Sequence, residues 1–147
     1  NRSIETMPRA FGVVATAREA QRIKKKNRGN TGLAVRASAS IPDIFWPVLI
    51  AGVEYVDGGL SSRVPVAVAR SMGADVVVAV DVSWRGSDEV AQADVPIRPD
   101  TPRTRTLDFS ARLESIAAGE VAARAALPLL RERLAEAVKA RVSLAPR

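Results

Sequence analysis

What most constrains the fold of this chain is the order of local signals in residues 53–82. A β-prone run, residues 53–56, is followed by an acid, two glycines and a polar loop. Pro65 then suits the first turn of a helix, because its missing N–H costs nothing there, and Gly73 suits the end of that helix. Residues 75–82 form an apolar run that is typical of a strand covered on both faces. This order predicts a right-handed βαβ crossover and hence an α/β fold.

Asp57 is the candidate functional residue of this stretch. It stands where the β-prone run ends, directly before Gly58 and Gly59. Glycine adopts backbone angles closed to other residues and lets a ligand or a second backbone come close, so this carboxylate is fixed in direction yet approachable. Such an acid suits a catalytic base. The same Asp-Gly pair is also a common turn signal, and both interpretations stay open at this point.

The rest of the chain predicts short strands followed by a helical C-terminal segment. The predicted strands are residues 11–16, 19–23, 45–50 and 95–97, and the third pairs with residues 53–56 as a hairpin. A helix over residues 33–40 is capped by Asn30 or Thr31. From Leu107 onward the pattern is helical, with a kink or a restart at Pro128 and a core-facing apolar stripe over residues 113–138.

Composition excludes several classes of site. The chain has 147 residues, which suits one domain or part of one, and 47% of them are hydrophobic, which is enough to bury a core. It has no cysteine and no histidine, so a Ser-His-Asp triad and cysteine- or histidine-ligated metals cannot be built from it. Proton transfer must use Asp, Glu, Lys or Tyr, or residues outside this chain. No apolar run approaches the ~20 residues that span a bilayer.

The net charge of +6 favours anionic partners, and much of it lies in the basic run, residues 24–28. This run is interpreted either as a solvated loop tip, at which the preceding strand turns, or as an anion-binding patch. No aromatic residue lies near it to stack bases, so we expect no nucleic-acid partner.

Other polar residues have ordinary structural interpretations beside functional ones. Asp75 and Asp81 bracket the apolar strand, and a capping or hydrogen-bonding role for Asp81 is favoured over a ligand site. Residues 29–32 are interpreted as a turn and helix cap. Four serines could act as nucleophiles only in principle: Ser38, Ser40, Ser61 and Ser62. No Gly-x-Ser-x-Gly elbow surrounds any of them.

Taken together, these segments resemble the C-terminal half of a patatin-like phospholipase domain, of the bacterial kind similar to neuropathy target esterase. The segments that carry the resemblance are residues 35–45, 55–60, 63–66, 73–82 and 97–128. Their order and spacing match over most of residues 8–130. The resemblance implies an α/β, three-layer αβα domain with a mostly parallel sheet, of which residues 1–147 form the C-terminal part plus terminal helices.

The resemblance also implies a serine lipid acyl hydrolase that uses a Ser-Asp dyad without histidine, cofactor or metal. Asp57 matches the position of the family's base, and Gly58 and Gly59 complete its Asp-Gly-Gly motif. The chain lacks the family's elbow serine and its glycine-rich oxyanion segment. We therefore expect the serine to come from an N-terminal segment of the same protein and this chain alone to be inactive. Asp43 and Trp46 depart from residues common in the family and flank the expected acyl groove.

The expected reaction is hydrolysis of carboxylic ester bonds in phospholipids, lysophospholipids or related acyl lipids. One rival is a catalytically inactive, patatin-fold lipid-binding or regulatory module. A second rival, supported by charge alone, is a nucleic-acid or anionic-surface binder that uses the basic run. As a secondary hypothesis, the basic run helps to hold the protein at anionic bilayers. The expected location is cytoplasmic or peripheral to a membrane.

Overall fold

The chain has a mixed α/β structure. The computed structural model describes residues 2–20, 22–83, 85–102 and 108–144. These residues divide into two compact units, Asn1–Val68 and Ala69–Arg147, and each unit has its own sheet.

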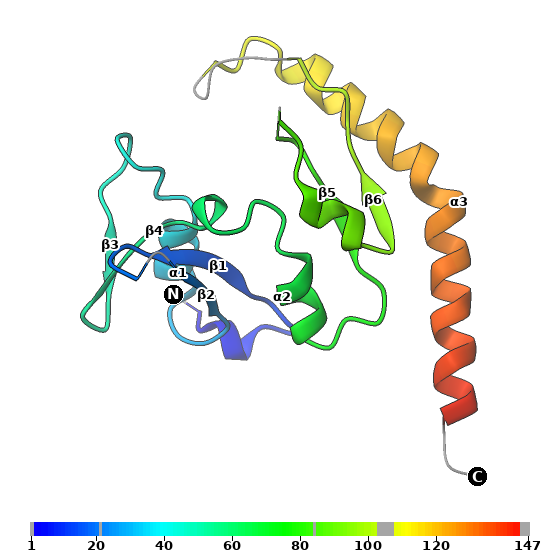
Figure 1. Cartoon of the computed structure of the whole chain (residues 1–147), viewed down its shortest axis with the longest axis horizontal. Coiled ribbons are helices and arrows are strands. Elements are labelled where there is room, and N and C mark those ends of the chain that lie inside the picture. Colours follow the sequence, from blue (N-terminus) through cyan, green and yellow to red (C-terminus); the bar gives the residue numbers. More distant parts are fainter. Residues whose placement is uncertain (1, 21, 84, 103–107, 145–147) are drawn as a thin grey trace. The chain divides into compact units, whose positions relative to one another are not determined.

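The first unit is built on a four-stranded antiparallel sheet in the order β2-β1-β4-β3 (Figure 1). The strands are β1 (Val13–Ala17), β2 (Arg22–Lys26), β3 (Val48–Ile50) and β4 (Val53–Asp57). β3 and β4 form the predicted hairpin, and its turn residues Ala51 and Gly52 both have positive φ, which matches the twist of the strands. The expected mostly parallel sheet is therefore not what this unit contains. Hairpins pair strands antiparallel, whereas a parallel pair needs a longer crossover.

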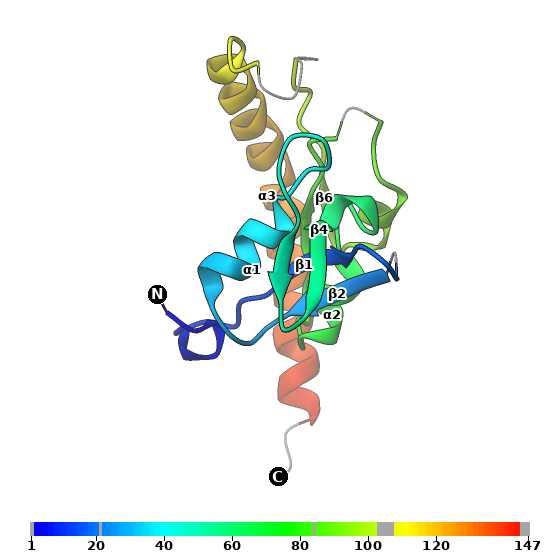
Figure 2. The ribbon, with the colours of Figure 1, turned by 90° about the vertical axis from the view of Figure 1, so that its left-hand side faces the viewer.

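The two faces of this sheet have different surroundings, because side chains alternate along each strand. One face packs against helix α1 (Thr31–Ser38), which lies beside the sheet in Figure 2. The core cluster on that side consists of Ala15, Ala17, Ala37, Val48 and Tyr55. On the other face Ile23, Thr16 and Val56 are cross-strand neighbours and form a row across β2, β1 and β4.

Helix α1 is capped as predicted. The side chain of Asn30 accepts a hydrogen bond from the backbone N–H of Leu33 at 2.9 Å, which satisfies one of the unpaired donors of the first turn. Gly29, just before the cap, accepts from the N–H of Ile4 at 2.9 Å, where the short 3₁₀ helix η1 (Ile4–Thr6) begins. The interpretation of residues 29–32 as a turn and helix cap is confirmed.

The second unit has a parallel pair, β5 (Val78–Val80) and β6 (Val95–Ile97), whose connection includes the 3₁₀ helix η3 (Asp88–Gln92). Its buried hydrophobic residues are Val77, Ala79, Val90 and Val95. Helix α2 (Val66–Ser71) begins directly after Pro65, as predicted, and the division between the units falls within it.

The predicted βαβ crossover is wrong, because β4 and β5 belong to separate sheets. The strand over residues 75–82 is also shorter than predicted. Val78 and Val80 are 42% and 52% exposed, so an apolar run on both faces does not mean cover on both faces within this chain. Both predictions assumed that the local sequence pattern of a strand determines which segment it pairs with. Pairing depends instead on hydrogen bonds between segments that are distant in the sequence.

Helix α3 (Arg112–Leu144) contacts β6 and runs through Pro128 without interruption. A restart is therefore not observed, and Figure 1 shows the axis of α3 bending part-way along its length. The predicted start at Leu107 lies outside the described residues. The apolar stripe is not core within this chain, since its members Leu113, Ile116, Val121, Leu134 and Val138 are each about half exposed or more.

Candidate active site

Asp57 is the last residue of β4 and the cap of the 3₁₀ helix η2 (Gly58–Leu60). Its Oδ1 accepts a hydrogen bond of 2.6 Å from the backbone N–H of Gly59. This bond fixes the rotation of the half-buried carboxyl group. No described residue donates a hydrogen bond to Oδ2. The carboxylate thus has one oxygen tied to the turn and one oxygen without a donor in the described part of the chain.

The backbone of Asp57 is held on both sides. Its N–H donates to the carbonyl of Ser40 at 2.9 Å, just beyond the end of α1. Its carbonyl accepts from Oγ1 of Thr16 in β1, also at 2.9 Å. Ser40 is itself buried, and its hydroxyl donates to the carbonyl of Arg36 at 2.7 Å. The helix end, the central strand and the turn therefore all fix the direction in which Asp57 projects.

The two motif glycines are required by close approaches that the structure shows directly. A Cβ on Gly58 would lie 2.2 Å from the carbonyl oxygen of Val14 in β1. A Cβ on Gly59 would lie 2.9 Å from Oδ1 of Asp57 itself. Gly58 therefore lets the turn pack on the sheet, and Gly59 makes room for the carboxylate. The Asp-Gly pair therefore forms a turn, as one of its two interpretations predicts.

The candidate serines lie in three different settings. Ser38 is the last residue of α1, and the Ser40 hydroxyl is used at the helix end. Ser62 is buried. Ser61 is exposed, and its Oγ lies 2.9 Å from Oγ1 of Thr16. None of these contacts joins a serine hydroxyl to a basic group, and a serine nucleophile needs one. The contacts given for these four serines therefore do not identify a nucleophile beside the acid.

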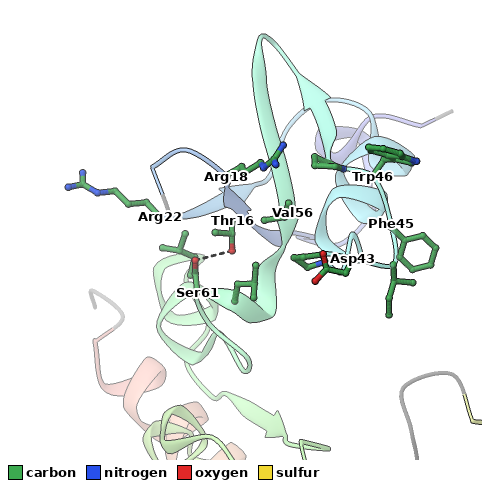
Figure 3. Close-up of a pocket in the computed structure, with 13 residues that line it drawn as sticks. Thr16, Arg18, Arg22, Asp43, Phe45, Trp46, Val56 and Ser61 are labelled. Carbon is green, nitrogen blue, oxygen red and sulfur yellow. Dashed lines mark hydrogen bonds between the residues drawn. The ribbon is translucent and has the colours of Figure 1, made fainter.

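An open groove of about 1240 Å³ lies on the face of the sheet opposite to α1 (Figure 3). Ile23, Thr16 and Val56 belong to the cross-strand row that forms its floor. The other lining residues are Arg18, Arg22, Pro42, Asp43, Ile44, Phe45, Trp46, Pro47, Leu60 and Ser61. Val56 and Leu60 flank the acid and its glycines in sequence, but Asp57 itself does not line the groove, since alternation along β4 places it on the face of its pair partner Ala15.

The wall of the groove opposite to Arg18 and Arg22 is apolar and exposed. Phe45 and Trp46 are 54% and 86% exposed, and both belong to the segment between α1 and β3 (Figure 3). Asp43 in the same segment has a φ of +66°, a left-handed conformation that Asp tolerates better than most residues. Asp43 and Trp46 both line this groove, and its identity with the expected acyl groove stays a prediction.

The basic run is partly a strand and not a loop tip. Its three lysines, residues 24–26, belong to β2 at the edge of the sheet, where lysine side chains protect an exposed edge. Lys26 is engaged with the core, since its Nζ donates to the Tyr55 hydroxyl at 2.9 Å and lies 4.1 Å from the centre of the ring. The predicted strand over residues 19–23 is displaced to Arg22–Lys26, because pairing with β1 outweighs the low β-propensity of lysine.

The acids of the second unit have structural partners. The buried carboxylate of Asp81 accepts hydrogen bonds from the N–H groups of Ser83 and Ser87, at 3.0 and 2.7 Å, and Arg98 lies 3.8 Å away. Desolvation raises the pKa of Asp81, but the Ser83 and Ser87 hydrogen bonds and the Arg98 charge outweigh it and hold this pKa below its ordinary value. Asp75 pairs with Arg141. The predicted hydrogen-bonding role of Asp81 is confirmed.

Two further properties bear on what the described residues can do. They contain no grouping of three or more acids that could hold a metal ion. None of their helices combines the length and apolar character needed to cross a membrane. The site at Asp57 is therefore described by a carboxylate, two glycines, two hydroxyl groups and an apolar groove.

Sequence reasoning missed Thr16 and the groove floor. The contact between Thr16 and Asp57 joins residues 41 positions apart, and it depends on the register of β1 against β4. A polar residue inside the otherwise apolar run 13–17 was a signal for such a contact. It did not say which group the hydroxyl meets.

Known proteins match the part of the chain that contains this site. The family model of patatin-like phospholipases matches residues 4–70, which include Asp57 and every residue of the groove. The chain is also similar to uncharacterized NTE family proteins of Mycobacterium bovis and of two strains of Mycobacterium tuberculosis. Each is 32% identical over 81 residues, which is 55% of this chain and 22% of the relative. The chain thus matches about a fifth of the length of these relatives.

Proposed function

We propose that this chain, which belongs to the patatin-like phospholipase family, is the part of a lipid acyl hydrolase that supplies the catalytic base, Asp57. The proposed reaction is hydrolysis of carboxylic ester bonds in phospholipids, lysophospholipids or related acyl lipids. The nucleophilic serine of the Ser-Asp dyad would come from an N-terminal segment of the same protein. The three-layer αβα arrangement remains part of the proposal for that whole domain, to which this chain contributes the antiparallel sheet.

The observation that carries the proposal is the way Asp57 is held. Its N–H, its carbonyl and Oδ1 are each engaged, and Oδ2 has no donor among the described residues. A carboxylate is a weak base for a hydroxyl, so it gains most when it is aligned in advance with the proton that it receives. The chain therefore offers an aligned acceptor that an incoming serine hydroxyl can use.

In the proposed mechanism Asp57 takes the serine proton as the serine oxygen attacks the ester carbonyl. Asp57 then gives this proton to the alcohol oxygen of the lipid, the alcohol leaves, and an acyl-enzyme forms. The same carboxylate then takes a proton from water as the water attacks the acyl-enzyme, and it returns this proton to the serine oxygen when the fatty acid is released. The proton transfers use the serine, the carboxylate, the leaving alcohol and water, and the glycine-rich segment that would stabilise the oxyanion would come from outside this chain, as the serine would.

The groove suits an acyl chain. Its floor and one wall are mostly apolar, with Thr16 and Asp43 as their polar members, and its volume of about 1240 Å³ exceeds the ~300–1,000 Å³ of common ligand pockets, as an open groove for a long substrate would. Burying methylene groups there would stabilise the complex by roughly 0.8 kcal/mol for each group. Val56 and Leu60 line the groove and are sequence neighbours of the Asp-Gly-Gly motif, whereas Asp57 itself does not line it.

The test uses a polypeptide that also contains the N-terminal segment proposed to carry the serine, and a short-chain acyl ester. Asp57→Asn keeps the size of the side chain and removes the base, so hydrolysis should fall to background while folding is retained. Asp100→Asn, an exposed acid of the second unit, is the matched control and should leave the rate unchanged. An Asp57→Asn variant that hydrolyses the ester as fast as the parent would refute the assignment.

A lipid-binding module without catalysis is the second candidate, because this chain has no Gly-x-Ser-x-Gly elbow of its own. A parent protein that binds acyl lipid but shows no hydrolysis, before or after Asp57→Asn, would favour this module. We also propose a peripheral contact with anionic membranes through the exposed lysines of β2. Equal sedimentation of the protein with neutral and acidic vesicles would count against that contact.

A further inference from the structure

Thr16 occupies a central place between the groove and the acid. It lies in the middle of β1, an inner strand of the sheet, and it is only 3% exposed. Its hydroxyl has two partners, the carbonyl of Asp57 at 2.9 Å and Oγ of Ser61 at 2.9 Å. Figure 3 shows Thr16 and Ser61 facing one another at one side of the groove.

The direction of these hydrogen bonds follows from counting protons. A carbonyl can only accept, so the single proton of the Thr16 hydroxyl is donated to Asp57. In the contact between the two hydroxyl groups Ser61 must then be the donor. The result is a directed chain from Ser61 through Thr16 to the carbonyl of Asp57. Each bond polarises the next, which strengthens the hold on that carbonyl.

We propose that Thr16, assisted by Ser61, is a positioning residue for the base, an inference that rests on the proposed function of Asp57. The carbonyl of Asp57 belongs to the peptide that joins it to Gly58, so a bond to this oxygen fixes the rotation of the backbone after the acid. The bond from its N–H to Ser40 fixes the backbone before it. Together they set the direction of the Cα–Cβ bond, and the Gly59 bond then sets the carboxyl rotation.

Threonine suits this role better than serine would. Its branched Cβ restricts χ1, so the hydroxyl stays aimed at one partner. The alternative is that Thr16 merely satisfies its own buried hydroxyl, as most buried polar groups do. The two interpretations differ in what they predict for turnover, because a structural hydrogen bond affects stability without affecting kcat selectively.

The experiment compares Thr16→Val, Thr16→Ser and Thr31→Val in the parent enzyme with a short-chain acyl ester. Valine removes the hydroxyl at nearly constant shape, and serine restores it. Thr31→Val is the matched control, since Thr31 also donates to a backbone carbonyl, that of Arg2, away from Asp57. We expect kcat of Thr16→Val to fall about 10- to 100-fold with KM changed less than about twofold, because misplacement of a reacting group by about 1 Å has such an effect.

Thr16→Ser should recover most of this loss, and Thr31→Val should show none. Parental kcat in Thr16→Val, a loss confined to KM, or no recovery with serine would each overturn the inference. Should Thr16→Val fail to fold, Ser61→Ala carries the test, because Ser61 is exposed and the variant removes the donor to Thr16. We expect its kcat to fall about threefold from the loss of cooperative polarisation, and a parental kcat would then overturn the inference.

Two further measurements separate this inference from the proposed function. If Asp57→Asn remains fully active, the assignment of the base fails, whatever Thr16 does. If Asp57→Asn is inactive and Thr16→Val is not impaired, only the positioning role fails. In the chain itself, amide exchange at Gly59 reports the hold on the turn without any catalysis. We expect it to accelerate at least about tenfold in Thr16→Val, and unchanged exchange would overturn the inference.

Discussion

Replacing Gly58 by alanine should destabilise the first unit strongly. The added Cβ would lie 2.2 Å from the carbonyl oxygen and 2.8 Å from the carbonyl carbon of Val14. Cβ atoms essentially never approach a heavy atom within 3.0 Å, so the turn and β1 must separate by about 0.8 Å. Val14 contributes backbone from an inner strand paired on both sides, which cannot rotate away. Forced overpacking of this kind costs about 3 kcal/mol, a change of more than about 100-fold in the unfolding equilibrium.

Urea unfolding, followed through the NMR signals of the β1 amides, measures this loss in the first unit alone. Gly119→Ala in α3 is the matched control, because nothing lies within 4 Å of its added Cβ, and it should stabilise the helix by about 0.5–1 kcal/mol. Gly59→Ala is the informative neighbour. Its Cβ meets Oδ1 of Asp57, the end of a side chain that can rotate, so stability should change little while the carboxylate moves. An unchanged urea midpoint in Gly58→Ala would refute the close approach of turn and strand.

Two other perturbations test the electrostatics of the two units. The pKa of Asp81 is lower in the folded state than in the unfolded chain, so its contribution to stability is present above the unfolded pKa of about 3.9 and is lost as pH falls through the folded pKa. Asp81→Asn should therefore lower the urea midpoint of the second unit at pH 7. It should also reduce the fall of this midpoint between about pH 5 and 2. The same fall of the midpoint with pH in the variant and the parent would contradict this role. Lys26→Met removes a hydrogen bond and a cation–π contact and should cost about 1–2 kcal/mol. In a double-mutant cycle with Tyr55→Phe, strictly additive losses would show that the two groups do not interact through the hydroxyl.

Local signals in the sequence predicted local structure well. The cap at Asn30, the hairpin turn at residues 51–52 and the helix that begins after Pro65 all depend on neighbours within a few positions. Such features follow from backbone angles and missing or added hydrogen-bond donors, which the residue types themselves decide. The end of β4 at Asp57 belongs to the same class.

Pairing between distant segments was not predictable in the same way. The lysines of β2 have low β-propensity, so the sequence does not predict a strand at these residues. Only their pairing with β1 in the structure identifies the strand. The apolar stripe of α3 predicts that this face of the helix is buried but does not identify the segment that covers it. Within this chain the stripe is largely exposed. The partners of Asp57 are 17 and 41 residues away, at Ser40 and Thr16. The position of the acid could therefore be predicted, and the contacts that aim it could not.

Every contact that aims Asp57 comes from one continuous stretch, residues 14–61. This stretch folds within one compact unit and within the segment that matches the family. In the proposed dyad, a serine on another segment would meet a carboxylate whose direction and rotation are already fixed, so little conformational entropy would be lost when the two come together. Half of a dyad can be pre-organised in this way because a carboxylate, unlike an imidazole, needs no third residue to select its tautomer. The hydrogen bonds that a third residue would otherwise supply are here made by the backbone of Gly59 and the hydroxyl of Thr16.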